Sequence, residues 1–207
     1  MGERYTPEMA VGLSVASDAQ ISPDGRWVAF CVAPIGHAET IPTSTIYIVP
    51  TDGSQLPRPL TDSDHNNTWP RWSPDSTSLV YLSDRPERGT QQVHRVSAAG
   101  GEPARLTNIE GGAERPVWSR DGREIFFTAR RAALEGKKES SSEVKVASEE
   151  PRPRAVAAVA ATGGDVRLIG PRHGHVWAFD QSPDGRRFAA IVSPTNLLDE
   201  SADQTWL

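Results

Sequence analysis

Residues 22–27 read SPDGRW, and related phrases return as SPDSTS at 73–78, SRDGRE at 119–124 and SPDGRR at 182–187. Ser-Pro-Asp-Gly favours a tight turn, because proline presets φ, aspartate accepts hydrogen bonds from nearby backbone N–H groups, and glycine takes the left-handed position that follows. We therefore predict four turns built from the same residue types. The predicted turn residues are Ser22, Pro23, Asp24, Gly25, Ser73, Pro74, Asp75, Ser119, Asp121, Gly122, Ser182, Pro183, Asp184 and Gly185.

The segments on either side of these turns have the composition of β-strands. They are short, rich in β-branched and aromatic residues, and bounded by polar turns. A second hairpin with a glycine-containing turn follows each of the first three, at 45–61, 91–107 and 155–170. The predicted unit is therefore four antiparallel strands in two hairpins.

Four antiparallel strands that repeat every 40–50 residues or so are the signature of a β-propeller blade. We predict an all-β fold, a partial β-propeller of about three and a half blades. The segments are a short N-terminal helix and lead-in at 1–16, blades near 17–61, 67–107, 114–170 and 175–207, and a charged, exposed insertion at 130–154 with a short strand at 143–148. A flat sandwich is the alternative, but it would not explain the matching second hairpins.

The end of the sequence falls within the predicted fourth blade. Its third strand should start at 205–207, which read TWL. We therefore expect this chain to be the front part of a longer protein. We also expect the isolated chain to self-associate or to be marginally stable, with the fourth blade fraying first, because incomplete blades expose apolar faces and strand edges.

Composition limits the partners and the compartment. The 207 residues carry a net charge of −5 with no dense Lys/Arg stripe, which argues against nucleic-acid binding. The first twenty residues lack a basic start followed by an apolar core, and no apolar run approaches the ~20 residues that span a bilayer. Cys31 is the single cysteine and has no internal partner, which fits a reducing compartment. We therefore expect a cytoplasmic location and no membrane contact.

A search for catalytic and metal-binding residues predicts none in this chain. A nucleophile elbow reads Gly-x-Ser-x-Gly, and the nearest match, GLSVA at 12–16, lacks the final glycine. His173 and His175 could hold a metal ion, but no third ligand is evident, so we interpret them as a polar entry to a strand. No cofactor is predicted.

Two groups of residues could contact a ligand. The first is the set of tryptophans that precede the turns, namely Trp69, Trp72, Trp118 and Trp177. We expect them to pack between blades, with ligand stacking as the alternative. The second is Glu114 with Arg115, beside a first strand. Since the first strand of a propeller blade lines the central channel, this pair could face a passing peptide. Cys31 alternates with Trp27 and Ala29 and is expected to be buried.

The opening stretch YTPEMAVGLSVASDAQISPDGRWVAFCV, at 5–32, resembles the start of the prolyl oligopeptidase family of serine peptidases. The similarity is strongest to its acylaminoacyl-peptidase and dipeptidyl-peptidase-like branch, and it continues through WSPDSTSLVYLSDR (72–85) and WSRDGREIFFTAR (118–130). The shorter SPDG phrase is also similar to TolB-like propellers. Two positions depart from the repeat: Ser76 stands where glycine is usual, and Arg120 where proline is usual.

The resemblance implies a role in peptide hydrolysis. In this family an α/β-hydrolase domain follows the propeller and supplies a Ser, Asp and His triad, while the propeller admits only short or loosely folded peptides. This chain would then be the non-catalytic propeller part, with the C-terminal hydrolase domain and peptide substrates as partners. The alternatives are a TolB-like protein-interaction module and a propeller enzyme with a site in its own channel.

Overall fold

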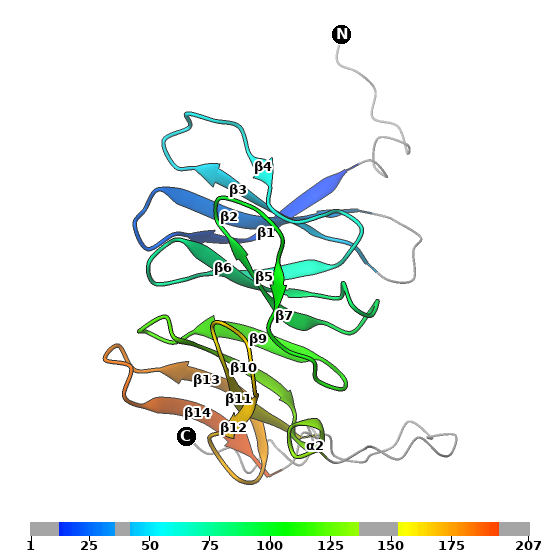
Figure 1. Ribbon diagram of the computed structural model, residues 1–207, viewed down its shortest axis with the longest axis vertical. Helices are drawn as coiled ribbons and strands as arrows, with labels where there is room; N and C mark the ends of the chain where they lie inside the picture. Colours follow the sequence, from blue (N-terminus) through cyan, green and yellow to red (C-terminus); the bar gives the residue numbers. More distant parts are fainter. Residues whose placement is uncertain (1–12, 36–41, 137–152, 195–207) are drawn as a thin grey trace. The chain divides into compact units, whose positions relative to one another are not determined.

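The structure is a computed structural model that describes residues 13–35, 42–136 and 153–194 (Figure 1). The chain divides into two compact units, Met1–Ala104 and Arg105–Leu207, and each is considered by itself. Nearly all regular structure in the described residues is β-strand, which confirms the predicted all-β class. Among the same residues, no helix has the length and apolar character needed to cross a membrane.

The first unit contains two antiparallel four-stranded sheets, which are the first and second blades (Figure 1). In both sheets the strands pair in sequence order, so that each sheet is two consecutive hairpins. The division between the units falls within the last strand of the second blade. The first blade comprises β1 (Ser14–Ile21), β2 (Trp27–Pro34), β3 (Thr45–Pro50) and β4 (Arg58–Pro59); the second comprises β5 (Asn67–Trp72), β6 (Ser78–Ser83), β7 (Gln92–Ser97) and β8 (Ala104–Arg105).

The second unit contains the third blade and, within the described residues, two strands of a fourth. A short helix, α2 (Arg131–Leu134), follows the second strand of the third blade. The third blade comprises β9 (Ala113–Trp118), β10 (Glu124–Arg130), β11 (Arg154–Ala160) and β12 (Arg167–Ile169); β13 (His175–Gln181) and β14 (Phe188–Ser193) form the antiparallel hairpin of the fourth.

The four repeated phrases all form turns between the first and second strands of a blade, as predicted. The glycine-containing second hairpins are also confirmed, as β3–β4, β7–β8 and β11–β12. Blades of four antiparallel strands with this order agree with a partial β-propeller.

Two predicted boundaries were wrong. Residues 14–16 belong to β1 and not to a helical lead-in, because they continue the ladder in which Ser14 pairs with Pro34. The predicted insertion at 130–154 begins too early, since Arg130 ends β10, Arg131–Leu134 form α2, and Arg131 is buried. The predicted N-terminal helix before residue 13, the strand at 143–148 and the strand start at 205–207 all lie outside the described residues.

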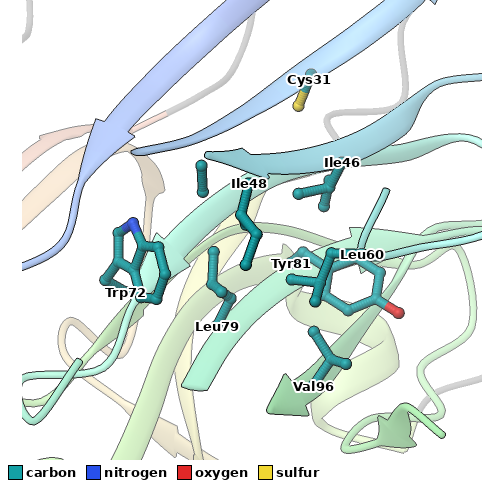
Figure 2. Close-up of a cluster of buried hydrophobic side chains, with 9 residues drawn as sticks. Cys31, Ile46, Ile48, Leu60, Trp72, Leu79, Tyr81 and Val96 are labelled. Atoms are coloured by element: carbon teal, nitrogen blue, oxygen red, sulfur yellow. The ribbon is translucent and has the colours of Figure 1, made fainter. Parts of the chain in front are cut away.

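The core of the first unit lies between its two blades (Figure 2). Side chains that alternate along β2 and β3 face the second blade, which contributes Trp72, Leu79, Tyr81 and Val96. The first blade contributes Ala29, Cys31, Ile46, Ile48 and Leu60. Burying one large apolar side chain contributes about 1.5–3 kcal/mol, so this cluster is the main force that joins the two sheets. The prediction that Cys31 is buried is confirmed.

In the second unit the third blade packs against the β13–β14 hairpin. Phe126 of β10 meets Phe188 of β14 edge to face, with ring centroids 4.8 Å apart. Ile125 and Phe127 of β10 are fully buried, whereas Phe188 is 45% exposed. A hollow of about 300 Å³ lies beside Phe126, Ile169 and Phe188. This core is therefore less completely covered than the core of the first unit.

Candidate functional site

The four repeated turns share one hydrogen-bond pattern. In the first, the Ser22 hydroxyl donates to the Asp24 carboxylate at 2.6 Å and accepts from the Trp27 amide at 3.0 Å. The same carboxylate accepts from the Arg26 amide at 3.1 Å. Equivalent bonds are made by the Ser-Asp pairs 73/75, 119/121 and 182/184. Serine and aspartate in these turns therefore fix the backbone.

The same bonds set the charge state of the turn carboxyls. In all four turns the hydrogen bond from the serine hydroxyl, and then the bond from the amide two residues on, lower the pKa of the aspartate. Hydrogen bonds to a carboxylate favour its charged form. A proton donor or acceptor for catalysis at neutral pH needs a pKa near 7, so these aspartates are suited to holding the turn and not to proton transfer.

The two departures from the repeat each tie one turn to the neighbouring blade of the same unit. Ser76 adopts φ of 61°, close to the 74° of Gly25, and its hydroxyl accepts from the Asp24 amide at 3.0 Å. The main-chain N–H of Arg120 donates to the side-chain oxygen of Gln181 at 2.9 Å. Proline has no N–H and could not make this bond. Both departures therefore have a structural reason.

The first strand of each of the three complete blades contains a β-bulge that sequence reasoning missed. In each bulge two residues oppose one on the second strand. The first of the two has a positive φ: 48° at Asp18, 59° at Trp69 and 53° at Arg115. Large side chains rarely adopt this conformation, and bulges redirect a side chain out of the ladder. These three equivalent positions carry different chemistry, an acid, an aromatic ring and a base.

In the first unit the bulge residues form a tie between blades. One guanidinium nitrogen of Arg71, on β5, lies 2.9 and 3.0 Å from the two carboxylate oxygens of Asp18, on β1. The same guanidinium stacks 4.4 Å from the centre of the Trp69 ring. Close by, the Trp72 indole donates to the Gln20 carbonyl at 2.9 Å. The prediction that tryptophans pack between blades is confirmed for Trp72.

The predicted ligand-facing pair, Glu114 and Arg115, makes contacts inside the second unit. Glu114 forms an ion pair with Arg154 of β11, and both side chains are about two-fifths exposed. Arg115 is exposed, and its guanidinium donates to the main-chain oxygen of Trp177 at 2.7 Å. Arg115 thus joins the third blade to β13, as Asp18 and Arg71 join the first two blades. Contact with a peptide stays a prediction.

His175 lies at the entry to a strand, as predicted, but it is buried. Its side chain is almost fully buried, and Nδ1 accepts from the main-chain N–H of Arg154 at 3.0 Å. Burial, followed by the positive charge of Arg154, lowers its pKa. His173, by contrast, is exposed. Among the described residues, no three His, Cys, Asp or Glu side chains gather closely enough to hold a metal ion.

A polar network at the connection between the first and second blades was not predicted. The Asp62 carboxylate lies 2.7 Å from His65 Nδ1 and accepts from Arg85 Nε at 2.9 Å. Burial opposes the charged form of Asp62, but the hydrogen bond and charge of His65, together with Arg85, keep its pKa below the usual value. Arg85 also pairs with Glu102. In the sequence, Asp62 and His65 are recognisable as polar residues of one loop, typical of a turn. Their partners Arg85 and Glu102 come from two other loops, so the network itself could not be predicted.

With this geometry in place, comparison with known proteins decides the family. Residues 8–151 match the PD40 family, the TolB β-propeller domain. The chain belongs to the TolB β-propeller domain family. The four-stranded blades described above are the blades of this TolB β-propeller domain.

Curated relatives of this TolB β-propeller chain include peptidases. It is 34% identical over 129 residues to "Uncharacterized peptidase YuxL" of Bacillus subtilis, covering 62% of this chain and 19% of that protein. It is 32% identical over 127 residues to "Dipeptidyl-peptidase 5" of Porphyromonas gingivalis, covering 61% and 18%. The chain therefore spans less than one fifth of the length of these relatives. This similarity supports the prediction of a propeller region like those of peptidases.

A solved structure agrees on the fold. "AtxE2 Isopeptidase" superposes with a TM-score of 0.62 at 19% identity, covering 93% of this chain and 39% of that protein. At this identity the likeness shows the fold alone.

Ser14, the nearest sequence match to a nucleophile, lies in strand β1 of the TolB β-propeller, whereas a nucleophile elbow lies at a strand-to-helix turn.

Proposed function

We propose that this chain is the non-catalytic propeller part of a serine peptidase of the acylaminoacyl-peptidase or dipeptidyl-peptidase-like kind. The observation that carries the proposal is the 34% identity, over 129 residues, to a protein named a peptidase. In this proposal an α/β-hydrolase domain outside this chain performs the hydrolysis. The coverage supports this, since the chain spans less than one fifth of that protein. A cytoplasmic location stays part of this proposal.

In this proposal the propeller controls which peptides reach the hydrolase domain. The contacts between first strands support such a role, since Asp18–Arg71 and Arg115–Trp177 tie neighbouring blades of each unit together. Blades that are tied at their first strands resist separation. A rigid ring would exclude folded proteins and admit short peptides. Glu114 and Arg115 are the side chains that we propose contact a passing peptide, because both are accessible and charged.

Two experiments test the peptidase assignment. The reading frame downstream of Leu207 should contain a Gly-x-Ser-x-Gly motif some hundreds of residues further on. The 207-residue chain alone should not react with a serine-directed fluorophosphonate probe, whereas the whole protein should. Labelling of this chain at one serine, abolished by replacing that serine, would contradict the proposal.

The channel role of Arg115 is testable in the whole protein. We expect Arg115→Gln to raise KM for peptides of about ten residues more than for dipeptide derivatives, with kcat little changed, because uniform binding is lost. Arg123→Gln is the matched control, since Arg123 is an exposed arginine at a turn of the same blade. Equal effects of both variants on KM would remove Arg115 from the peptide path. Thermal unfolding of each variant separates a binding effect from loss of the bond to Trp177.

A TolB-like protein-interaction module is the second candidate, and the family match favours it. It predicts a reading frame that completes two to four further blades and then stops. It also predicts no fluorophosphonate labelling of the whole protein. The same two experiments therefore distinguish the two candidates.

A further inference from the structure

His175 joins the third blade to the β13–β14 hairpin through a single ring nitrogen. It is the first residue of β13, is 1% exposed, and lies opposite Ser193 of β14. Its Nδ1 accepts from the main-chain N–H of Arg154, at the start of β11. A ring nitrogen that accepts a hydrogen bond carries no proton, so this contact requires the neutral imidazole with its proton on Nε2.

Hydrogen bonds hold the segment before His175 in place, so this segment cannot move together with the imidazole ring. Arg131 of α2 is buried, and its guanidinium donates to the carbonyls of Pro171, Arg172 and Gly174 at 2.9–3.1 Å. Gly174 leaves no room for a side chain, because an added Cβ would lie 2.6 Å from the Ser193 oxygen. A change at His175 is therefore transmitted to the contact between β13 and β11.

The charges around His175 come from three elements. Arg154 lies on β11, Glu114 and Arg115 lie on β9, and Arg131 lies on α2. Glu114 alone would favour a protonated ring, and its carboxylate is already paired with Arg154. Burial, Arg154 and Arg115 oppose a second proton on the imidazole. The ring is thus neutral near pH 7, and its Nδ1 can accept the hydrogen bond from Arg154.

We propose that His175 is an acid-operated latch between the third blade and the β13–β14 hairpin. A proton taken from solvent by Nδ1 would place two N–H donors, from the ring and from Arg154, against each other. The hydrogen bond is then lost, and a positive charge lies beside Arg154 in a buried position. β13 separates from β11 while the four strands of the third blade stay paired. This inference goes beyond the proposed peptidase role and does not depend on it.

The first unit provides an internal contrast for the latch. Asn67 occupies the corresponding place, as the first residue of β5 opposite Ser83, and is also fully buried. Its amide donates to the main-chain oxygen of Asp62 at 3.0 Å and does not titrate. The main chain of Ser44 bonds directly to that of His65 and Asn67. The latch is therefore a property of the second unit.

Hydrogen exchange of the 207-residue chain tests the latch. Protection factors, corrected for the intrinsic exchange rate, would be compared at about pH 7.5 and about pH 5.5. We expect the β13 amides at 176–181 to lose about tenfold protection at the lower pH, because opening exposes the ring, which then takes a proton at its ordinary pKa of about 6.5, one unit above the lower pH. Amides of β6, in the first unit, should keep theirs.

Two variants sharpen this test. His175→Asn supplies an oxygen acceptor without a titrating group, so β13 protection should no longer depend on pH. His65→Asn, in the first unit, is the matched control and should leave the β13 response unchanged. A wild-type chain with equal β13 protection at both pH values, or an asparagine variant that keeps the drop, would overturn the proposal.

If the His175→Asn variant does not fold, ¹⁵N NMR of the wild-type imidazole decides. Nδ1 should change from unprotonated to protonated with the same midpoint at which β13 loses protection. Midpoints that differ would show that another group controls the separation, and the proposal would be wrong.

Discussion

Neighbouring blades are joined by different kinds of hydrogen bond in the two units. The two junctions compared are the one between the first and second blades and the one between the third and fourth. In the first, the backbone of Ser44 bonds directly to the strand entry of the next blade. In the second, two side chains, His175 and Arg131, make the corresponding contacts. Backbone bonds survive most substitutions and pH changes, whereas side-chain bonds can be lost by one mutation or one proton. We therefore expect a single mutation or proton at His175 to weaken the second junction, whereas the backbone bonds of Ser44 should persist in the first.

The first junction also buries its apolar side chains more completely than the second. Leu79 and Phe188 hold the equivalent place, six residues after the serine of their turn, yet Leu79 is fully buried and Phe188 is 45% exposed. In the second blade β7 contributes Val96 to the cluster around Leu79 (Figure 2). The first junction therefore has the larger apolar contribution to stability.

The largest expected effect on the free energy of unfolding comes from replacing Leu79, in comparison with Phe188. Leu79→Ala should lower the free energy of unfolding by about 2–5 kcal/mol, because it removes a buried side chain and leaves a cavity. Phe188→Ala, its matched counterpart, should cost about 1 kcal/mol, since much of the ring already meets water. Urea unfolding, followed by tryptophan fluorescence, measures both. Equal losses would contradict the idea that the two junctions differ in their packing.

Replacement of Arg131 tests the side-chain clamp of the second junction. Arg131→Gln should destabilise the second unit by about 1–3 kcal/mol, because three carbonyls lose their donors in a buried place. Hydrogen exchange should report the loss in β13 and α2, with the first unit unaffected. Arg172→Gln is the control, because the Arg172 side chain is exposed. If both variants behave alike, the clamp contributes nothing.

A smaller effect is expected at the turn of the third blade. Arg120→Pro restores the usual repeat residue but removes the N–H that donates to Gln181. We expect a net loss of about 1–2 kcal/mol, because the bond from the N–H and the bond from the guanidinium to the Gln181 carbonyl are both lost. Thermal unfolding would detect it as a lower melting temperature. A higher melting temperature would mean that turn propensity outweighs the inter-blade bond.

The smallest effect should come from acid acting on the turns. The turn aspartates have a lowered pKa in the folded chain. Their contribution to stability is therefore present above the unfolded carboxyl pKa of about 4 and is lost as pH falls through the lower folded value. Since both units have these turns, both should weaken in this acid range.

The paired variants Asp24→Asn and Asp121→Asn check this symmetry. Each should reduce the pH dependence of unfolding below about pH 4 by a similar small amount, because both carboxyls are exposed and hydrogen-bonded alike. The latch at His175, in contrast, should weaken only below the ordinary histidine pKa of about 6.5, because burial and Arg154 lower the pKa of the ring, and it should act in the second unit alone. A large difference between the two aspartate variants would refute the equivalence of the turns.

Sequence reasoning succeeded where neighbours along the chain decide the structure. The Ser-x-Asp turns depend on bonds within six residues, and the alternation of Trp27, Ala29 and Cys31 places them on one face of β2. It failed where partners are distant in sequence. The bulges at Asp18, Trp69 and Arg115 contain no glycine, so no residue type in the sequence indicated them. Arg131 stands in a charged stretch, which led to the prediction of an exposed insertion, although Arg131 is buried.

For the candidate site residues too, the position along a strand could be predicted, but the partners that are distant in sequence could not. Glu114 and Arg115 were identified by their place on a first strand, but their partners, Arg154 and Trp177, lie 40 and 62 residues away. His175 was interpreted as a polar strand entry because nothing nearby in the sequence shows that it is buried. Its acceptor role depends on Arg154, which the third blade brings beside it.

The sequence by itself determined the repeated hairpin, its turn chemistry and the all-β class, because those depend on local conformational preference and on the period of two along a strand. Only the tertiary structure decided which polar side chains act between blades. Burial, charge and hydrogen-bond partners arise when separate blades pack, as at Asp18 with Arg71 and at His175 with Arg154. The residues that hold the blades together are therefore visible only after the blades are in contact.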